Sequence, residues 1–231
     1  MKNIIFAIIT LLPSLVMASG SNVHLESANI DLNDKASLQR GLAYFQQYCA
    51  GCHSTQYQRY NRVAEDLDIP LDKMRSDYMV GDAKIGDLME NAIPTDAAAK
   101  WFGAAPPDLT LVARVRGEDW IYSYLKGFYK ESDRIFGVNN TVFSLVGMPH
   151  ALEALQGDPV KQEDGSIVAT GGSKSAEEYD QVVKDITGFL VYSAEPIKLE
   201  RERIGFWVLG FLFIFFILAY LLKKEYWKDV H

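Results

Sequence analysis

Cysteine is scarce in this sequence, and basic residues are not in excess. The 231 residues include only Cys49 and Cys52, too few to staple a large domain with disulfides, so we expect them to serve chemistry. Lysine and arginine total 23 against 30 acidic residues, a net charge of −7 that argues against a nucleic-acid partner, because phosphate binding needs a basic surface. With 48% hydrophobic and 23% charged residues, the composition excludes collagen-like and disordered chains and favours one globular domain.

The mean hydropathy of −0.04 conceals two apolar segments, the first of them N-terminal. Lys2 precedes an apolar run over residues 4–16, and small residues follow at Ala18 and Ser19. A short basic start, an apolar run of about a dozen residues and a small-residue site are typical of a secretory signal peptide. The run is too short to cross a bilayer core of roughly 30 Å. The pattern therefore predicts a signal peptide over residues 1–18, cleaved after Ala18.

The second apolar segment, residues 204–222, is nineteen residues long and carries no charge. At about 1.5 Å per residue it spans roughly 28 Å, which suits one transmembrane helix. We place the anchor helix at residues 200–222 and a short tail at 223–231. Three lysines follow the helix and two arginines precede it, so charge alone is a weak guide to orientation. Export of the N-terminus instead predicts that residues 19–199 lie outside the cytoplasm and that the tail lies inside.

The charge is divided unevenly between these segments. Residues 19–199 hold 17 basic and 26 acidic residues, a net charge of −9, whereas the remaining residues carry +2. An acidic surface attracts a positively charged partner and speeds encounter at low salt. Solubility alone is the alternative explanation.

The chemistry-bearing motif is Cys49-Ala50-Gly51-Cys52-His53. C-x-x-C-H is the attachment signature of c-type haem, in which two thiols form thioethers with the porphyrin and the adjacent histidine is the proximal iron ligand. A disulfide, a thioredoxin-like redox pair and a zinc site are the alternatives. The segment before the motif has a helical pattern, whereas a thioredoxin-like motif follows a strand. A zinc site would need a second C-x-x-C or a close histidine pair, and the sequence has neither.

Two segments with helical periodicity frame this domain. Asn33 or Asp34 can cap a helix whose apolar face carries Leu38, Leu42, Phe45 and Cys49. Residues 175–194 show a similar stripe, formed by Tyr179, Val182, Ile186, Phe189 and Leu190. Pro196 then breaks the chain before the membrane helix. We expect these two helices to pack together, and we classify the fold as mainly α, a class I cytochrome c-like haem domain with long loops plus one C-terminal transmembrane helix.

The sixth coordination position separates an electron carrier from a haem enzyme. The candidate ligands in the exported domain are Met74, Met79, Met89, Met148, His24 and His150. Met148 is preferred because the flanking Gly147 and Pro149 mark an irregular loop, whereas Met89 suits a core position. His150 is the rival in the same loop, and bis-His ligation would lower the reduction potential that Met/His ligation raises. An open sixth site would instead indicate a haem enzyme or a gas sensor.

Several segments in fixed order resemble one family, the cytochrome c1 family of membrane-anchored haem subunits of the ubiquinol–cytochrome c reductase (cytochrome bc1) complex, in its proteobacterial form. The segments, spread over about residues 30–222, are SLQRG (37–41), CAGCHS (49–54), RYNR (59–62), GAAPPDLT (103–110), RVRGEDW (114–120), the stretch 139–149 from Asn139-Asn140 to Gly147-Met148-Pro149, and AEP (194–196). The attachment motif alone is common to c-type cytochromes, and the ordered set is far more selective.

The resemblance implies a role for each matching residue. Cys49 and Cys52 would hold one haem c, with His53 and Met148 as the axial ligands. Arg116 would pair with a haem propionate, although Arg114 lies close enough in sequence to be confused with it. Apolar walls would come from Pro106, Pro107 and Leu109, and Trp120 would pack beside the propionates or simply in the core.

The resemblance also implies partners and a location. The chain would carry electrons from a Rieske iron–sulfur protein to a soluble or tethered cytochrome c, beside cytochrome b and within a dimeric complex. Its haem domain would lie in the periplasm, anchored by a single pass in the bacterial inner membrane. Quinol oxidation belongs to other subunits of such a complex, so the chain by itself would be an electron carrier. A haem subunit of a terminal oxidase or a nitric oxide reductase is the alternative.

Two features depart from the better-known mitochondrial pattern. Pro149-His150 follows Met148 where a small residue and two prolines are usual, which leaves His150 open as a ligand. Residues 156–175 are rich in Gly, Asp, Ser and Lys, and residues 163–166 have the composition of a turn. We predict a surface hairpin there, between Pro159-Val160 and Ile167-Val168.

Overall fold

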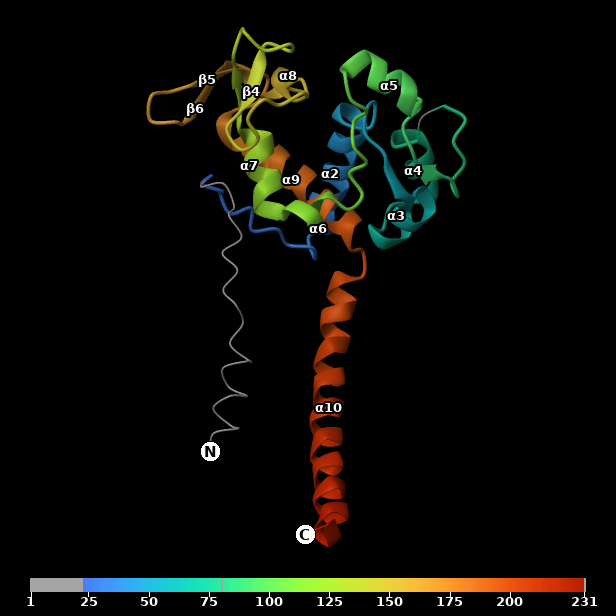
Figure 1. Ribbon diagram of the computed structural model, residues 1–231. Helices are drawn as coiled ribbons and strands as arrows, with labels where there is room; N and C mark the ends of the chain where they lie inside the picture. Colours follow the sequence, from blue (N-terminus) through green and yellow to red (C-terminus); the bar gives the residue numbers. More distant parts are fainter. Residues whose placement is uncertain (1–22, 80, 231) are drawn as a thin grey trace.

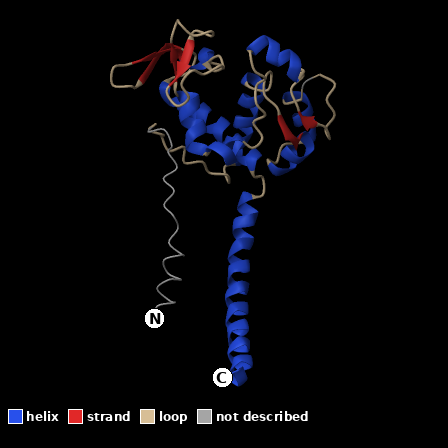
Figure 2. Ribbon diagram, viewed as in Figure 1, coloured by secondary structure: helices blue, strands red, loops and turns tan. Residues whose placement is uncertain are grey.

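The computed structural model of the protein describes residues 23–79 and 81–230. The predicted signal peptide, residues 1–18, lies outside the described residues. The helices are α2 (Lys35–Tyr48), α3 (Tyr60–Asp66), α4 (Leu71–Asp77), α5 (Thr95–Phe102), α6 (Val112–Arg116), α7 (Glu118–Lys126), α8 (Glu153–Gln156), α9 (Ala176–Ala194) and α10 (Lys198–Tyr226), followed by the 3₁₀ turn η1 (Trp227–Val230). Helices dominate the described chain, as the sequence predicted, and the strands are short (Figure 2).

The core is built around α2 and α9, which lie against each other in the middle of the domain with α7 beside α9 (Figure 1). Asp34 caps α2 by accepting a hydrogen bond from the Ser37 N–H at 3.0 Å. A capping box formed by Ser175 and Glu178 begins α9. The predicted apolar stripes meet between the two helices, where the rings of Phe45 and Phe189 are 5.3 Å apart. The predicted helix pair is therefore confirmed.

Gly41 sets how closely these two helices approach. A Cβ atom at this position would lie 1.9 Å from the backbone oxygen of Asp185 and 2.9 Å from Cβ of Phe189. The Asp185 carboxylate is buried beside this crossing, where it accepts hydrogen bonds from the Arg40 guanidinium at 2.7 and 2.9 Å and from the Ser37 hydroxyl at 2.6 Å. A buried carboxylate is tolerated only when it is paired in this way, so the polar cluster fixes α2 against α9.

The strands form three separate antiparallel pairs in the described residues. β1 (Thr55–Arg59) pairs with β2 (Leu88–Met89), and β3 (Phe128–Lys130) pairs with β4 (Val138–Asn140). β5 (Gly157–Lys161) pairs with β6 (Ile167–Gly171), with Val160 opposite Val168. The hairpin predicted in residues 156–175 is thereby confirmed.

The last helix, α10, leaves the domain as a single rod (Figure 1). It begins two residues after Pro196 and runs for 29 residues, about 43 Å at 1.5 Å per residue, so it is longer than the apolar run of residues 204–222. None of its described side chains is buried against the domain. It is the one helix in residues 23–79 and 81–230 that is long and apolar enough to cross a membrane, which agrees with a single C-terminal anchor.

Candidate functional site

The C-x-x-C-H motif forms a turn at the C-terminal end of α2. Cys49 caps the helix, and its carbonyl accepts hydrogen bonds from the N–H groups of Cys52 at 3.0 Å and His53 at 2.9 Å. Both cysteines are free thiols, which contradicts the disulfide alternative. Burial raises the pKa of the Cys49 thiol to about 12, so this thiol is uncharged at neutral pH. The sequence thus places two available thiols and an imidazole on one turn.

The His53 ring is held in a defined orientation. Its Nδ1 lies 2.7 Å from the carbonyl oxygen of Pro107, and because a carbonyl can only accept, Nδ1 carries the proton. The ring is buried, and burial lowers the pKa of His53, which keeps the imidazole neutral. Nε2 makes no hydrogen bond to the described residues. A neutral imidazole fixed through Nδ1 with Nε2 left over is the arrangement that binds a metal.

Residues 106–110 pack against the segment that begins at His53. No local sequence pattern predicts these contacts. The Leu109 N–H donates to the Ser54 carbonyl at 2.8 Å, and Asp108 accepts from the Gln56 N–H at 2.8 Å. Asn91 also ties this turn together, since its amide donates to the Cys52 carbonyl at 2.9 Å and its N–H donates to the Ser54 hydroxyl at 2.9 Å. Asn91 and Asp108 were missed from the sequence because their partners lie 37 to 52 residues away.

Met148 lies beside an aromatic column on α7. The hydroxyl of Tyr124 donates to the Met148 sulfur at 3.5 Å, and burial raises the pKa of Tyr124 to about 12, so the hydroxyl keeps its proton. The Trp120 ring stacks on Tyr124 at 4.9 Å, and the Arg116 guanidinium lies 5.0 Å from the centre of the Trp120 ring. The structure therefore brings three predicted site residues together through Tyr124, which the sequence analysis did not single out.

The two candidate arginines point to different partners. Arg114 forms an ion pair with Glu195 at 3.0 Å, near the start of α10. Arg116 is exposed and has no carboxylate partner among the described residues, so its donors remain free for an anion. The contact with Trp120 fixes its position beside the aromatic column.

His150 occupies a different environment from Met148. Its ring is buried, stacks on Phe128 at 4.8 Å, and its Nε2 lies 2.6 Å from the side-chain oxygen of Gln156. Burial lowers the pKa of His150 to about 4 despite that hydrogen bond. One of its two ring nitrogens is thus engaged inside the fold.

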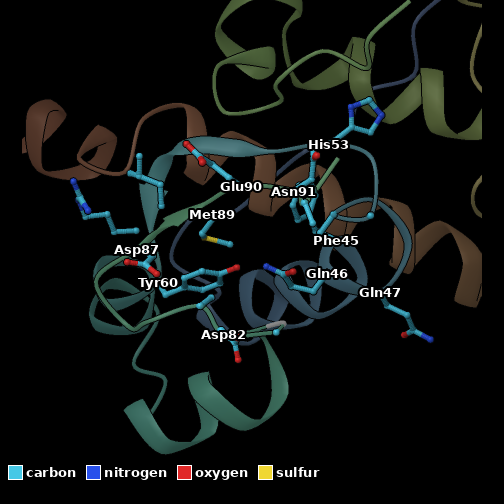
Figure 3. A pocket seen from close by; sticks show the side chains of 17 residues that line it. Phe45, Gln46, Gln47, His53, Tyr60, Asp82, Asp87, Met89, Glu90 and Asn91 are labelled. Atoms are coloured by element: carbon cyan, nitrogen blue, oxygen red, sulfur yellow. The ribbon is translucent and has the colours of Figure 1, made fainter. Parts of the chain in front are cut away.

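A cavity of about 820 Å³ lies behind the motif, between α2 and the β1–β2 pair. Buried Tyr60 and Met89 line it together with Gln46, and the His53 ring lies apart from these side chains at the edge of the group (Figure 3). Neither Met148 nor Arg116 lines this cavity.

Comparison with known proteins identifies the family. The sequence profile of the Cytochrome C1 family matches residues 26–230. The chain belongs to the cytochrome c1 family. It is 55% identical to cytochrome c1 of Allochromatium vinosum over the full length of both chains, and 28% identical to cytochrome c1 of Blastochloris viridis, covering 92% of this chain and 89% of that one. It is also 44% identical to a Nitrosomonas europaea protein named "Ammonia monooxygenase gamma subunit", over 96% of each chain.

Family membership agrees with the geometry of the motif. The cytochrome c1 family carries covalently bound haem c, and here Cys49 and Cys52 are the attachment residues. The chain is a haem-bearing electron-transfer subunit of the cytochrome bc1 type. The residues present fit the group: two free thiols and a neutral imidazole fixed by the Pro107 carbonyl share one turn.

Proposed function

We propose that this chain relays single electrons from a Rieske iron–sulfur protein to a cytochrome c, with His53 and Met148 as the two axial ligands in a class I cytochrome c-like domain. The observation that carries the proposal is the 2.7 Å contact between Nδ1 of His53 and the Pro107 carbonyl, which assigns the proton to Nδ1 and leaves Nε2 for iron. Haem c, when bound, supplies a one-electron iron centre.

Each surrounding residue has a distinct task in this proposal. The Pro107 carbonyl orients His53, and the Tyr124 hydroxyl orients the Met148 thioether. Pro106, Pro107 and Leu109 present apolar, donor-free side chains that keep water away and favour a high reduction potential. Arg116 offers paired donors to a propionate, and Trp120 holds its guanidinium.

The assignment of Met148 has a direct test. Met148→Leu removes the thioether but keeps an apolar side chain of similar volume, so we expect the reduced protein to bind carbon monoxide and the reduction potential to fall. His150→Ala is the matched variant, expected to leave the iron six-coordinate. If His150→Ala opens the iron and Met148→Leu does not, the bis-His assignment is correct. An unaltered protein that already binds carbon monoxide would contradict the relay and favour a haem enzyme or a gas sensor.

For the location, we propose a periplasmic haem domain on a single inner-membrane pass, with the C-terminus in the cytoplasm. The exposed, apolar α10 supports the single pass. Lys223 and Lys224 lie at its C-terminal end, whereas Arg201 and Arg203 at its N-terminal end are paired with Glu195 and Glu200. Cysteine labelling of the tail in intact cells and in inverted membrane vesicles tests the orientation.

For the partners, we propose cytochrome b and the Rieske protein, within a dimeric complex. The acidic domain, with a net charge of −9 over residues 19–199, suits a basic cytochrome c as the acceptor. Because the Nitrosomonas relative is named as a subunit of a monooxygenase, purification in mild detergent with identification of the co-purifying subunits is the deciding experiment. Cytochrome b and an iron–sulfur protein are expected, and subunits of an oxidase or a monooxygenase would contradict the assignment.

A further inference from the structure

Two adjacent buried asparagines lie at the base of the loop that carries Met148. Asn139 and Asn140 end strand β4 and are 6% and 2% exposed. The following residues, 141–148, contain no helix or strand, and beyond Thr141, whose N–H donates to the Gly127 carbonyl at 2.9 Å, their N–H groups have no ladder partner. We call this segment the Met148 loop.

The side-chain oxygens of both asparagines accept hydrogen bonds from this loop. Oδ1 of Asn140 accepts from the N–H groups of Val142 at 2.9 Å and Phe143 at 3.1 Å. Oδ1 of Asn139 accepts from the N–H of Leu145 at 2.9 Å and from the N–H of Asn140 at 2.9 Å. Two side chains thus supply the acceptors that a ladder would otherwise give to the N–H groups of Val142, Phe143 and Leu145.

The amide nitrogens of the same pair fasten the loop to its surroundings. Nδ2 of Asn140 donates to the Tyr124 carbonyl at 2.8 Å, and Nδ2 of Asn139 donates to the Glu131 carboxylate at 2.7 Å. Tyr124 is the residue whose hydroxyl contacts the Met148 sulfur. Asn140 therefore donates to the backbone of Tyr124, and Met148 contacts the side chain of the same residue.

The loop and its neighbour Gly127 show two signs of conformational constraint. Leu145 has a φ of +61°, in the left-handed region of the backbone. Residues other than glycine, asparagine and aspartate seldom adopt this conformation. Gly127 has no room for a side chain, since a Cβ there would lie 2.5 Å from Oγ1 of Thr141 and 3.2 Å from Oδ1 of Asn140. Such a conformation persists only where surrounding contacts determine it.

We propose that Asn139 and Asn140 are positioning residues that hold the Met148 loop so that the thioether stays on the iron. The inference rests on the proposed ligation by Met148. Without the pair, the N–H groups of Val142, Phe143 and Leu145 lose their hydrogen-bond acceptors. The loop then changes conformation so that these groups can hydrogen-bond to water. The thioether then leaves its place beside Tyr124.

The test is the coordination state of the haem-loaded full chain in detergent at about pH 8, where carboxylates are ionised. Asn140→Ala removes all three contacts of that side chain. Asn139→Asp keeps the acceptor but sets a carboxylate against Glu131, and Asn139→Asp with Glu131→Gln restores the match of donor and acceptor. Gln39→Ala removes one amide contact, to the Leu67 carbonyl at 2.7 Å, outside this loop and serves as the control for lost stability.

We expect Asn140→Ala and Asn139→Asp to lose the thioether–iron charge-transfer band of the ferric protein and to bind carbon monoxide when reduced. The double variant regains the band, and Gln39→Ala never loses it. The inference is overturned if both single variants keep the band while Met148→Leu binds carbon monoxide. If Met148→Leu also leaves the iron closed, the proposed ligation itself is wrong and the inference falls with it. Should Asn139→Asp yield no haem protein, the double variant decides, with an intact band supporting the inference and an open or unrecovered protein overturning it.

Discussion

Gly41 is the residue at which the spacing of the core is decided. The added Cβ of Gly41→Ala would meet the Asp185 backbone at 1.9 Å, and backbone cannot yield as a flexible side chain does. We expect the variant to lose about 3 kcal/mol of unfolding free energy, the upper end for an overpacked core, measured by denaturant titration of the domain. Gly86→Ala is the control, because open space surrounds that position, and it should change stability by less than about 0.5 kcal/mol.

Asp180 gives the domain a dependence on acid. Burial opposes its charge, but hydrogen bonds from Tyr122, Lys126 and Lys184 outweigh it and lower the pKa of Asp180 to about 2, from an ordinary 3.8. The folded chain therefore keeps this carboxylate charged longer than the unfolded chain as pH falls. Its stabilisation is complete above about pH 4 and is lost as the pH drops through about 2.

The corresponding variant is Asp180→Asn. We expect its unfolding midpoint to lie below that of the unaltered protein at pH 6 to 7, and the gap to narrow between about pH 4 and pH 2. Thermal unfolding followed by circular dichroism measures both. A gap that stays constant with pH would show that the carboxylate's charge plays no part.

Glu195 joins three elements at the foot of the domain. Its carboxylate accepts a hydrogen bond from Nε of Arg201 at 2.5 Å and lies 3.0 Å from Nη1 of Arg114. Arg201 is in the first turns of α10, and Arg114 is in α6. The hydrogen bond from Arg201 lowers the pKa of Glu195, so the group is charged at neutral pH. We expect Glu195→Gln to loosen the junction and to speed trypsin cleavage at Lys198 and Arg201 severalfold, without a change in the haem spectrum. Glu200→Gln, which affects only the pair with Arg203 inside α10, should leave that rate unchanged.

Elements with a local signal could be predicted from the sequence, whereas their contacts could not. Residues close together in the sequence determine the apolar stripes of α2 and α9 and the turn of the β5–β6 hairpin. The helix cap at Asp34 is determined locally as well. The thiols and the imidazole of the motif share one turn for the same reason. Asn91, Tyr124 and the amide nitrogen of Asn140 act through partners that lie 16 or more residues away and that only the folded chain brings near. A polar residue in a loop gives no sign in sequence of which backbone it will satisfy.

At the scale of the molecule, the domain and the anchor are separable. No described side chain of α10 is buried, so removal of residues 198–231 takes nothing from the core. We expect the shortened chain, with its haem attached, to move from the membrane fraction to the soluble fraction and to keep its absorption spectrum. Retention in the membrane would mean that a second attachment exists, such as an uncleaved apolar run at residues 4–16.

The crossing of α2 and α9 also imposes an order of events on synthesis. Arg40 and Asp185, which pair at the crossing, are 145 residues apart, so the core cannot close until almost the whole domain has been made. The attachment motif emerges early, at the end of α2, while its eventual cover is still unmade. Contacts of such long range form slowly, because the intervening chain must first be brought together. The two thiols therefore stay accessible for haem attachment until the later segments have been made and have packed over them.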